Sequence, residues 1–205
     1  MKKFVKKAWP FAVVASLAVT SVATWNFTRS SEVNADENGS NAKIKNVIVL
    51  IGDGMGPSYM TAHRYMKDNP KTFEMESTEF DKHLVGTQKT YPEDEHENIT
   101  DSASAATAMS AGIKTYNAAI AVDNDKAEVK TVLEQAKEKG KSTGLVATSE
   151  ITHATPAAFG AHDISRKNMD AIANDYFDEK IKGKHKVDVM LGGGVKNFVR
   201  KDRNL

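Results

Sequence analysis

Apolar runs and helical repeats alternate along the chain after residue 45. Val47 to Ile51 is a continuous β-branched and aliphatic run, which predicts a strand buried on both faces of a parallel sheet. Pro57 begins a segment that predicts a helix to about Lys67, since Pro is tolerated in a first turn. His83 to Tyr91 weakly resembles a strand, and Pro92 to Asn98 (PEDEHEN) predicts an exposed acidic loop.

The second half continues the same alternation. Ser102 to Ser110, rich in Ala and Ser, predicts a closely packed helix. Apolar residues at i, i+3, i+4 and i+7 predict an amphipathic helix over 128–139, and a similar pattern predicts another around 169–177. Each is followed by an apolar run, at 143–148 and at 186–191, that predicts a strand.

This order predicts an α/β fold with a mainly parallel sheet, whose active site lies beyond the carboxyl ends of the strands. Asp53 follows the first predicted strand, and Thr148 to Pro156 follows a later one. The glycines at 192–194 predict a turn, after which the chain stops without a closing helix or strand. We therefore expect a truncated domain.

The first 35 residues predict a secretory signal. MKKFVKKAW is a basic start, Phe11 to Trp25 is apolar, and Val33-Asn34-Ala35 resembles a cleavage site. An uncleaved anchor is the alternative, but the run is shorter than the roughly 20 apolar residues of a bilayer span. We expect residues 36–205 to be secreted or held in the periplasmic or cell-wall space, with no stable membrane span after cleavage.

The amino-acid composition limits which ligands and metal sites we expect in this domain. The 40% hydrophobic and 27% charged residues are typical of a globular protein. Without residues 1–35 the chain has 23 bases and 26 acids, about −3 in formal charge, which does not favour nucleic-acid binding. There is no cysteine, so any metal must be bound by oxygen or imidazole nitrogen.

The stretch VIVLIGDGMGPSYM resembles a dinucleotide-binding loop but does not match its spacing. Pro57 stands where the third glycine of that motif belongs. A carboxylate close to a pyrophosphate would repel it unless a cation lay between them. Asp53, which follows a predicted strand and is flanked by glycines, is better explained as a metal ligand. A turn or helix cap is the alternative role.

The stretch ITDSASAATAMSAG places Ser102 at a predicted helix start, directly after Asp101. Free amides and the helix dipole favour an anion there, whereas a simple N-cap is the alternative. No G-x-S-x-G elbow is present, so a hydrolase triad is not expected. A serine without a neighbouring base can lose its proton to solvent if a metal binds its oxygen.

The stretch SEITHATPAAFGAHDISR gathers polar residues after a predicted strand. Thr155 reads as an N-cap followed by Pro156 at the first helical position. His153 and His162 are nine residues apart, which does not suit two ligands on one helical face, so we expect His162 to be structural. Arg166 is either a surface charge or a guanidinium fork that binds two oxygens of a tetrahedral anion.

Taken together, IGDGMG, TDSASAATA, ITHATPAAFGAHDISR and LGGGVKNFVRKDRNL resemble the amino-terminal half of an alkaline phosphatase, in order and in spacing. The resemblance covers essentially all of residues 36–205. It implies a three-layer α/β sandwich with a mainly parallel central sheet, incomplete here at the carboxyl end. It also implies an exported hydrolase of phosphate monoesters, a homodimer in its full-length form, with two zinc ions and one magnesium.

The resemblance also implies metal-binding roles for three residues. Asp53 matches the carboxylate that bridges the second zinc and the magnesium. Thr155 matches a magnesium ligand. His153 falls beside the magnesium, where family members have either aspartate or histidine, with contact through water expected.

The catalytic residues implied in the same way are Ser102, Arg166 and Asp101. Ser102 matches the nucleophile that becomes phosphorylated. Arg166 matches the arginine that binds two phosphate oxygens, and Asp101 matches the acid that orients this arginine.

The family's remaining metal ligands come from a carboxyl-terminal half that this chain lacks. We therefore expect the chain alone to bind zinc poorly and to hydrolyse little phosphate ester. Two alternatives stay open. One is a related metal-dependent sulfatase or phosphodiesterase. The other is a non-catalytic fragment that captures phosphate or Mg²⁺ through Asp53, Thr155 and Arg166.

Overall fold

The computed structural model describes residues 44–199, and the chain divides into two units, residues 1–49 and 50–205. In the first unit, the described residues 44–49 are exposed and belong to no helix or strand. The predicted signal at 1–35 lies outside the described residues, so it and the domain boundary at residue 36 stay predictions. No helix between residues 44 and 199 is long and apolar enough to cross a membrane.

The prediction of a buried strand at 47–51 is wrong for this structure. These residues form no strand, and Ile48 and Leu50 are 86% and 91% exposed. The weak strand expected at 83–91 is absent too. A strand needs a neighbouring strand for its backbone hydrogen bonds, and no strand in the described part of the chain pairs with either segment.

The helix predicted from Pro57 is confirmed. Helix α1 (Pro57–Lys67) begins with proline in its first turn, as expected. The short helix α2 (Glu79–Lys82) follows, with a capping box between Thr78 and Asp81. Arg64 Nε of α1 donates to both carboxylate oxygens of Asp81, at 2.9 and 3.1 Å, which joins the two helices.

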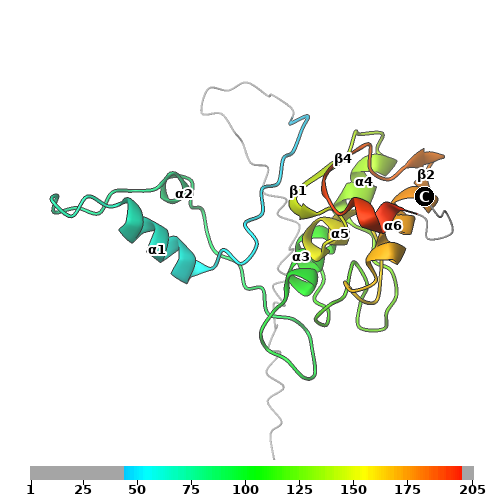
Figure 1. The fold of residues 1–205 in the computed structure, drawn as a ribbon, viewed down its shortest axis with the longest axis horizontal. Helices are drawn as coiled ribbons and strands as arrows, with labels where there is room; N and C mark the ends of the chain where they lie inside the picture. Colours follow the sequence, from blue (N-terminus) through cyan, green and yellow to red (C-terminus); the bar gives the residue numbers. More distant parts are fainter. Residues whose placement is uncertain (1–43, 200–205) are drawn as a thin grey trace, which may run out of the picture. The chain divides into compact units, whose positions relative to one another are not determined.

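The remaining elements confirm an α/β fold with a parallel sheet (Figure 1). Strands β1 (Gly144–Glu150) and β4 (Val189–Gly193) pair in parallel, with Leu145 opposite Met190. A small antiparallel hairpin that the sequence analysis missed, β2 (Lys180–Ile181) and β3 (Lys184–His185), lies in the crossover. The helices are α3 (Ser102–Ala111), α4 (Val132–Glu138), α5 (Ala154–Gly160) and α6 (Met169–Asp178), with the 3₁₀ turn η1 (Val195–Phe198).

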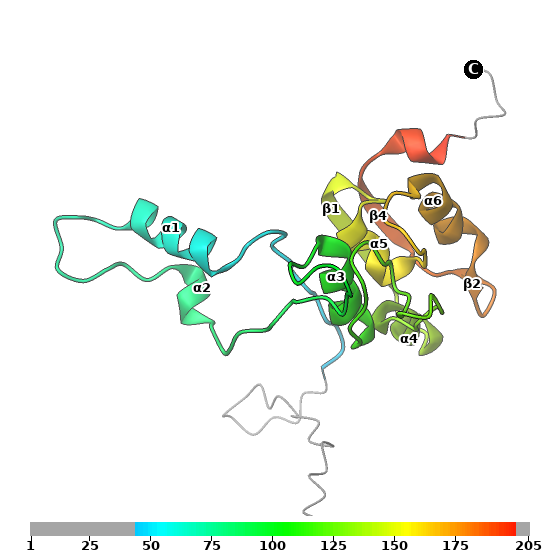
Figure 2. The same cartoon turned by 90° about the horizontal axis from the view of Figure 1, so that it is seen from below.

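Helix α5 lies at the centre of the core, where it packs against β1, α3 and α4 (Figures 1 and 2). The contact with α3 is close because both helices present alanine there, including the buried Ala103, Ala106, Ala157 and Ala158. At Gly160 an added Cβ would lie 3.0 Å from Tyr176 and 3.1 Å from Leu145. Small residues therefore set how near the helix carrying Thr155 lies to the helix carrying Ser102.

The predicted boundaries at α4 and at the glycine turn shift for local reasons. Helix α4 begins at Val132, four residues later than expected, because Thr131 and Glu134 form a capping box. The turn expected at 192–194 begins only at Gly194, which has a φ of 91°. Gly192 continues β4, where an added Cβ would lie 3.2 Å from the Ile151 Cβ.

A buried charge network supports the loop that follows α5. Lys186 is 1% exposed, and its Nζ donates to Asp175 and Glu179, each at 2.8 Å. His162 Nδ1 donates to the Ala121 carbonyl and Nε2 to Glu134, each at 2.9 Å. The expected structural role of His162 is confirmed, because both ring nitrogens are used within the fold.

The contacts of His162 shift two pKa values in opposite directions. Burial by itself lowers the pKa of His162, but the hydrogen bonds with Glu134 and the Ala121 carbonyl outweigh it and raise the pKa above the ordinary 6.5. Burial raises the pKa of Glu134, yet hydrogen bonds from His162 and the Thr131 amide lower it overall, below 4.5. Both shifts favour the charged forms of the pair, imidazolium and carboxylate.

This pair predicts how stability depends on pH. A raised histidine pKa contributes stability that is complete below 6.5 and is lost as the pH rises through the folded value. We expect the free energy of unfolding, measured by urea denaturation, to fall as the pH is raised above 6.5. The variant His162→Gln should lose this dependence, whereas His63→Gln on the exposed face of α1 should keep it. An unchanged pH profile in His162→Gln would contradict the assignment.

Candidate functional site

Asp53 joins two hydroxyl groups from distant parts of the chain. Its Oδ1 accepts a hydrogen bond from Ser102 Oγ at 3.1 Å, and its Oδ2 accepts one from Thr155 Oγ1 at 2.7 Å. The loop carrying Asp53 turns at Gly54, whose φ of 67° suits glycine. The carboxylate is exposed. Three residues predicted from separate motifs are therefore brought together.

Ser102 is the first residue of α3, and Asp101 caps that helix. Asp101 Oδ1 accepts a hydrogen bond from the Ser104 amide at 2.9 Å, so the alternative role of an N-cap is confirmed. Its Oδ2 has other partners: it accepts from Arg166 Nη1 at 3.1 Å and from the Ala118 amide at 3.0 Å. One carboxylate thus caps the serine helix and holds the arginine.

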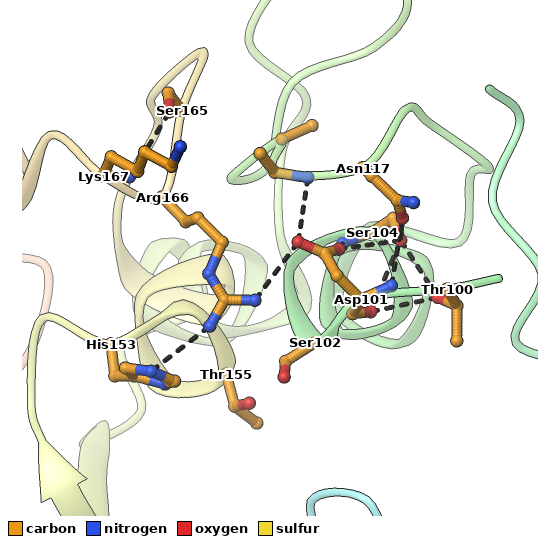
Figure 3. A network of polar contacts seen from close by, with 12 residues as sticks. Thr100, Asp101, Ser102, Ser104, Asn117, His153, Thr155, Ser165, Arg166 and Lys167 are labelled. Atoms are coloured by element: carbon orange, nitrogen blue, oxygen red, sulfur yellow. Dashed lines mark hydrogen bonds and ion pairs between the residues drawn. The ribbon is translucent and has the colours of Figure 1, made fainter. Parts of the chain in front are cut away.

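The Arg166 guanidinium lies between Asp101 and His153 (Figure 3). Its Nη2 is 3.2 Å from His153 Nε2. Because arginine only donates, His153 Nε2 accepts, which places the ring proton on Nδ1. The Arg166 side chain is 23% exposed. Hydrogen bonds therefore fix the Arg166 guanidinium in position while it stays accessible to solvent, unlike a mobile charged side chain on the surface.

The predicted helix-capping role of Thr155 is wrong. Helix α5 begins two residues earlier than expected, at Ala154, and His153 is the capping position, so Thr155 is the second helical residue. Its hydroxyl therefore faces Asp53 and satisfies no helix amide. The threonine contributes to the site instead of to the helix end.

The segment Tyr116–Ala119 also supports the site, and the sequence analysis missed it. Ala118 donates its amide to Asp101, and its carbonyl accepts from the Arg166 amide at 2.8 Å. It does so in the left-handed region, with φ of 74°. No glycine in TYNAAIAV marks this turn, so the pattern of residues carries no signal for it.

The oxygen donors around Asp53 fit a hard divalent cation. The Asp53 carboxylate has a hydroxyl within hydrogen-bonding distance of each of its two oxygens, and oxygen ligands are those that Mg²⁺ prefers. Glu134, His162 and Glu179 form a second cluster of possible metal ligands, but we do not assign a metal site to it. Lys186 Nζ, 4.0 Å from Glu134 and 2.8 Å from Glu179, already supplies the positive charge there.

The chain is similar to known alkaline phosphatases in sequence and in fold. The profile of the family described as alkaline phosphatase matches residues 44–204. Alkaline phosphatase 3 of Bacillus subtilis (strain 168) is 66% identical over 205 residues, which are 100% of this chain and 44% of that protein. The chain therefore spans less than half the length of this curated relative.

Two solved structures share the fold. The cold-active alkaline phosphatase of the psychrophile Shewanella sp. is 50% identical, with a TM-score of 0.66 over 73% of this chain and 36% of that one. A histidine-to-glutamate variant of TAB5 alkaline phosphatase, described with Mg bound in its M3 site, is 40% identical. Its TM-score is 0.61, over 74% of this chain and 40% of that one.

The left-handed backbone at Ala118 predicts a stabilising substitution. We expect Ala118→Gly to raise the free energy of unfolding by about 0.5–1 kcal/mol, because relief of the left-handed strain exceeds the added entropy of the unfolded chain. The neighbouring Ala119→Gly, which has no positive φ to relieve and empties a buried position, should lower it by about 1 kcal/mol. Urea denaturation measures both, and destabilisation by Ala118→Gly would refute the strain.

The oxygen donors predict a magnesium effect on stability. We expect Mg²⁺ to raise the melting temperature, because a ligand that binds only the folded state stabilises it. Asp53→Asn should abolish this rise, whereas Asp125→Asn, in an exposed turn, should leave it intact. Equal rises in both variants would show that Mg²⁺ acts elsewhere.

Proposed function

This chain belongs to the alkaline phosphatase family, and from that premise we propose that it contributes to the hydrolysis of phosphate monoesters with Ser102 as the nucleophile. The observation that supports this most directly is the convergence on Asp53. Ser102 and Thr155 both donate to that carboxylate, and Arg166 is held nearby through Asp101. A hydroxyl, an anion-binding fork and oxygen donors for a cation are the parts that phosphoryl transfer needs.

Arg166 would bind and orient the phosphoryl group. Each of its terminal nitrogens carries two N–H groups, and the bonds to Asp101 and His153 use one on each. The remaining N–H groups can donate to two non-bridging oxygens of a phosphate. The start of α3 adds the positive end of a helix dipole at Ser102.

Ser102 would form the covalent intermediate. Its oxygen bonds to phosphorus as the bond to the ester oxygen breaks, and the ester oxygen leaves as the alcohol after it gains a proton. Water then cleaves the serine phosphate and releases inorganic phosphate. In this ground state the Ser102 proton points to Asp53 Oδ1, so the hydroxyl is already directed toward an acceptor.

Metal ions would be held here by Asp53 and Thr155, with His153 beside them through water. When bound, the two zinc ions and one magnesium that we propose would favour the alkoxide form of a hydroxyl and offset phosphate charge. The Mg described in the TAB5 variant supports the magnesium. We expect slow turnover from the chain by itself, since the site residues we identify include few metal ligands.

We further propose that the protein is exported and that its full-length form is a homodimer. The basic start and apolar run of residues 1–35 support export. The natural substrates would be phosphate monoesters.

Phosphate binding and covalent labelling test the proposal together. We expect calorimetry to show that the protein binds inorganic phosphate more tightly with Mg²⁺, and that Arg166→Ala weakens binding by about 1.5–3 kcal/mol, through loss of charge-assisted hydrogen bonds. After exposure to p-nitrophenyl phosphate with zinc and magnesium, mass spectrometry should detect phosphoserine at Ser102.

The Ser102→Ala variant is the control, because it removes the nucleophile and keeps the arginine. It should bind phosphate without becoming labelled. Phosphate binding with no phosphoserine in the unaltered protein would favour a capture protein and overturn the hydrolase proposal. Labelling by sulfate esters or diesters in preference to monoesters would instead favour the related metal-dependent classes.

A further inference from the structure

We propose that Asn117 is a positioning residue for the nucleophile, acting by fixing the backbone at the start of α3 against the acidic loop 94–99. The inference rests on the proposed role of Ser102, although its structural half can be tested without any activity. Nothing in the sequence pattern distinguishes Asn117 from an ordinary turn residue.

The side-chain amide of Asn117 uses its full hydrogen-bonding capacity. Nδ2 donates to Glu97 Oε2 and to the Ile99 carbonyl, both at 2.8 Å. Oδ1 accepts from the Asp101 amide at 3.0 Å and from Ser104 Oγ at 2.9 Å. Two acceptors face the nitrogen and two donors face the oxygen, so the arrangement requires an amide in this orientation.

The backbone of Asn117 is anchored to the same acidic loop. Its amide donates to Asp94 Oδ2 at 2.9 Å, while Asp94 Oδ1 accepts from the His96 amide at 2.8 Å. The hydrogen bond from the His96 amide, which has the larger effect, and the one from the Asn117 amide lower the pKa of Asp94. The segment predicted as an exposed acidic loop is therefore tied, through Asp94 and Glu97, to the segment that faces α3.

Two successive residues bind the backbone amide and the side-chain carboxylate of Asp101. Asn117 accepts from the Asp101 backbone amide (Figure 3), and Ala118 donates to the Asp101 carboxylate. Arg166 binds that same carboxylate and also the Ala118 carbonyl. A shift of Asn117 would therefore move Ser102, which follows Asp101, relative to the arginine. Phosphoryl transfer depends on such positioning.

An aspartate at this position would have the same size but the wrong polarity. It would direct a carboxylate oxygen at the Glu97 carboxylate and the Ile99 carbonyl, where the amide now donates. Both contacts would become repulsive, while the oxygen facing Asp101 and Ser104 would be kept. Asn117→Asp thus keeps an acceptor for α3 but replaces the tie to the loop with a repulsion, which would displace the side chain from its position against α3.

Amide hydrogen exchange measured by NMR tests the structural half. We expect Asn117→Asp to speed exchange of the Asp101 amide by about tenfold or more, because repulsion from Glu97 and the Ile99 carbonyl would displace the side chain and weaken the hydrogen bond that it accepts from that amide. Amides in α6 should be unaffected. Adding Glu97→Gln to Asn117→Asp should slow the exchange again, because an amide donor then faces the new carboxylate. Asn124→Asp makes the same charge change in an exposed turn and should have no effect.

Calorimetry with inorganic phosphate and Mg²⁺ tests the positioning half. Asn117→Asp should weaken phosphate binding several-fold, and the added Glu97→Gln should restore part of it. Unchanged Asp101 exchange in Asn117→Asp, or unchanged phosphate affinity despite faster exchange, would overturn the inference. If Asn117→Asp loses protection from exchange throughout the core, the double variant with Glu97→Gln is the deciding measurement. Failure of the double variant to slow exchange of the Asp101 amide would also overturn the inference. Failure of the unaltered protein to bind phosphate would count against the proposed function alone.

Discussion

The rest of the site depends on the hydrogen bonds that the Asp101 carboxylate accepts. It caps α3 through the Ser104 amide, binds the Ala118 amide and holds the Arg166 guanidinium. A carboxylate that only capped a helix could be replaced by serine or asparagine at little cost. Here the same two oxygens also set where the arginine lies relative to Ser102, so the geometry for an anion and the start of the helix are determined together.

The loop carrying Arg166 is held from its other side by buried charges. His162 binds Glu134 and the Ala121 carbonyl, and the next residue, Asp163, pairs with Ile120 through two backbone hydrogen bonds. Buried ionic groups are weak sources of net stability, but they tolerate few alternative arrangements. The network therefore acts mainly on the position of the loop.

The alkaline phosphatase family supplies the context in which these contacts become chemically meaningful. Hydroxyls, carboxylates and a guanidinium occur together on many protein surfaces, and none of them alone identifies a reaction. The match over residues 44–204 and the joint placement of Asp53, Ser102, Thr155 and Arg166 are the grounds for the proposal that phosphate monoesters are the substrate. The chain spans less than half the length of its Bacillus subtilis relative.

The sequence by itself determined the local features of this protein. A proline suited to a first turn, a run of Ala and Ser, and helical periodicity predicted α1, α3 and α6 in turn, and the motifs that resemble an alkaline phosphatase indicated Asp53, Ser102 and Arg166. Only the tertiary structure decided that residues 47–51 form no strand, that Thr155 faces a carboxylate, and that Asn117 and Ala118 support the serine helix. The physical reason is that strand pairing and side-chain hydrogen bonds depend on partners far away in the chain, which local pattern does not encode.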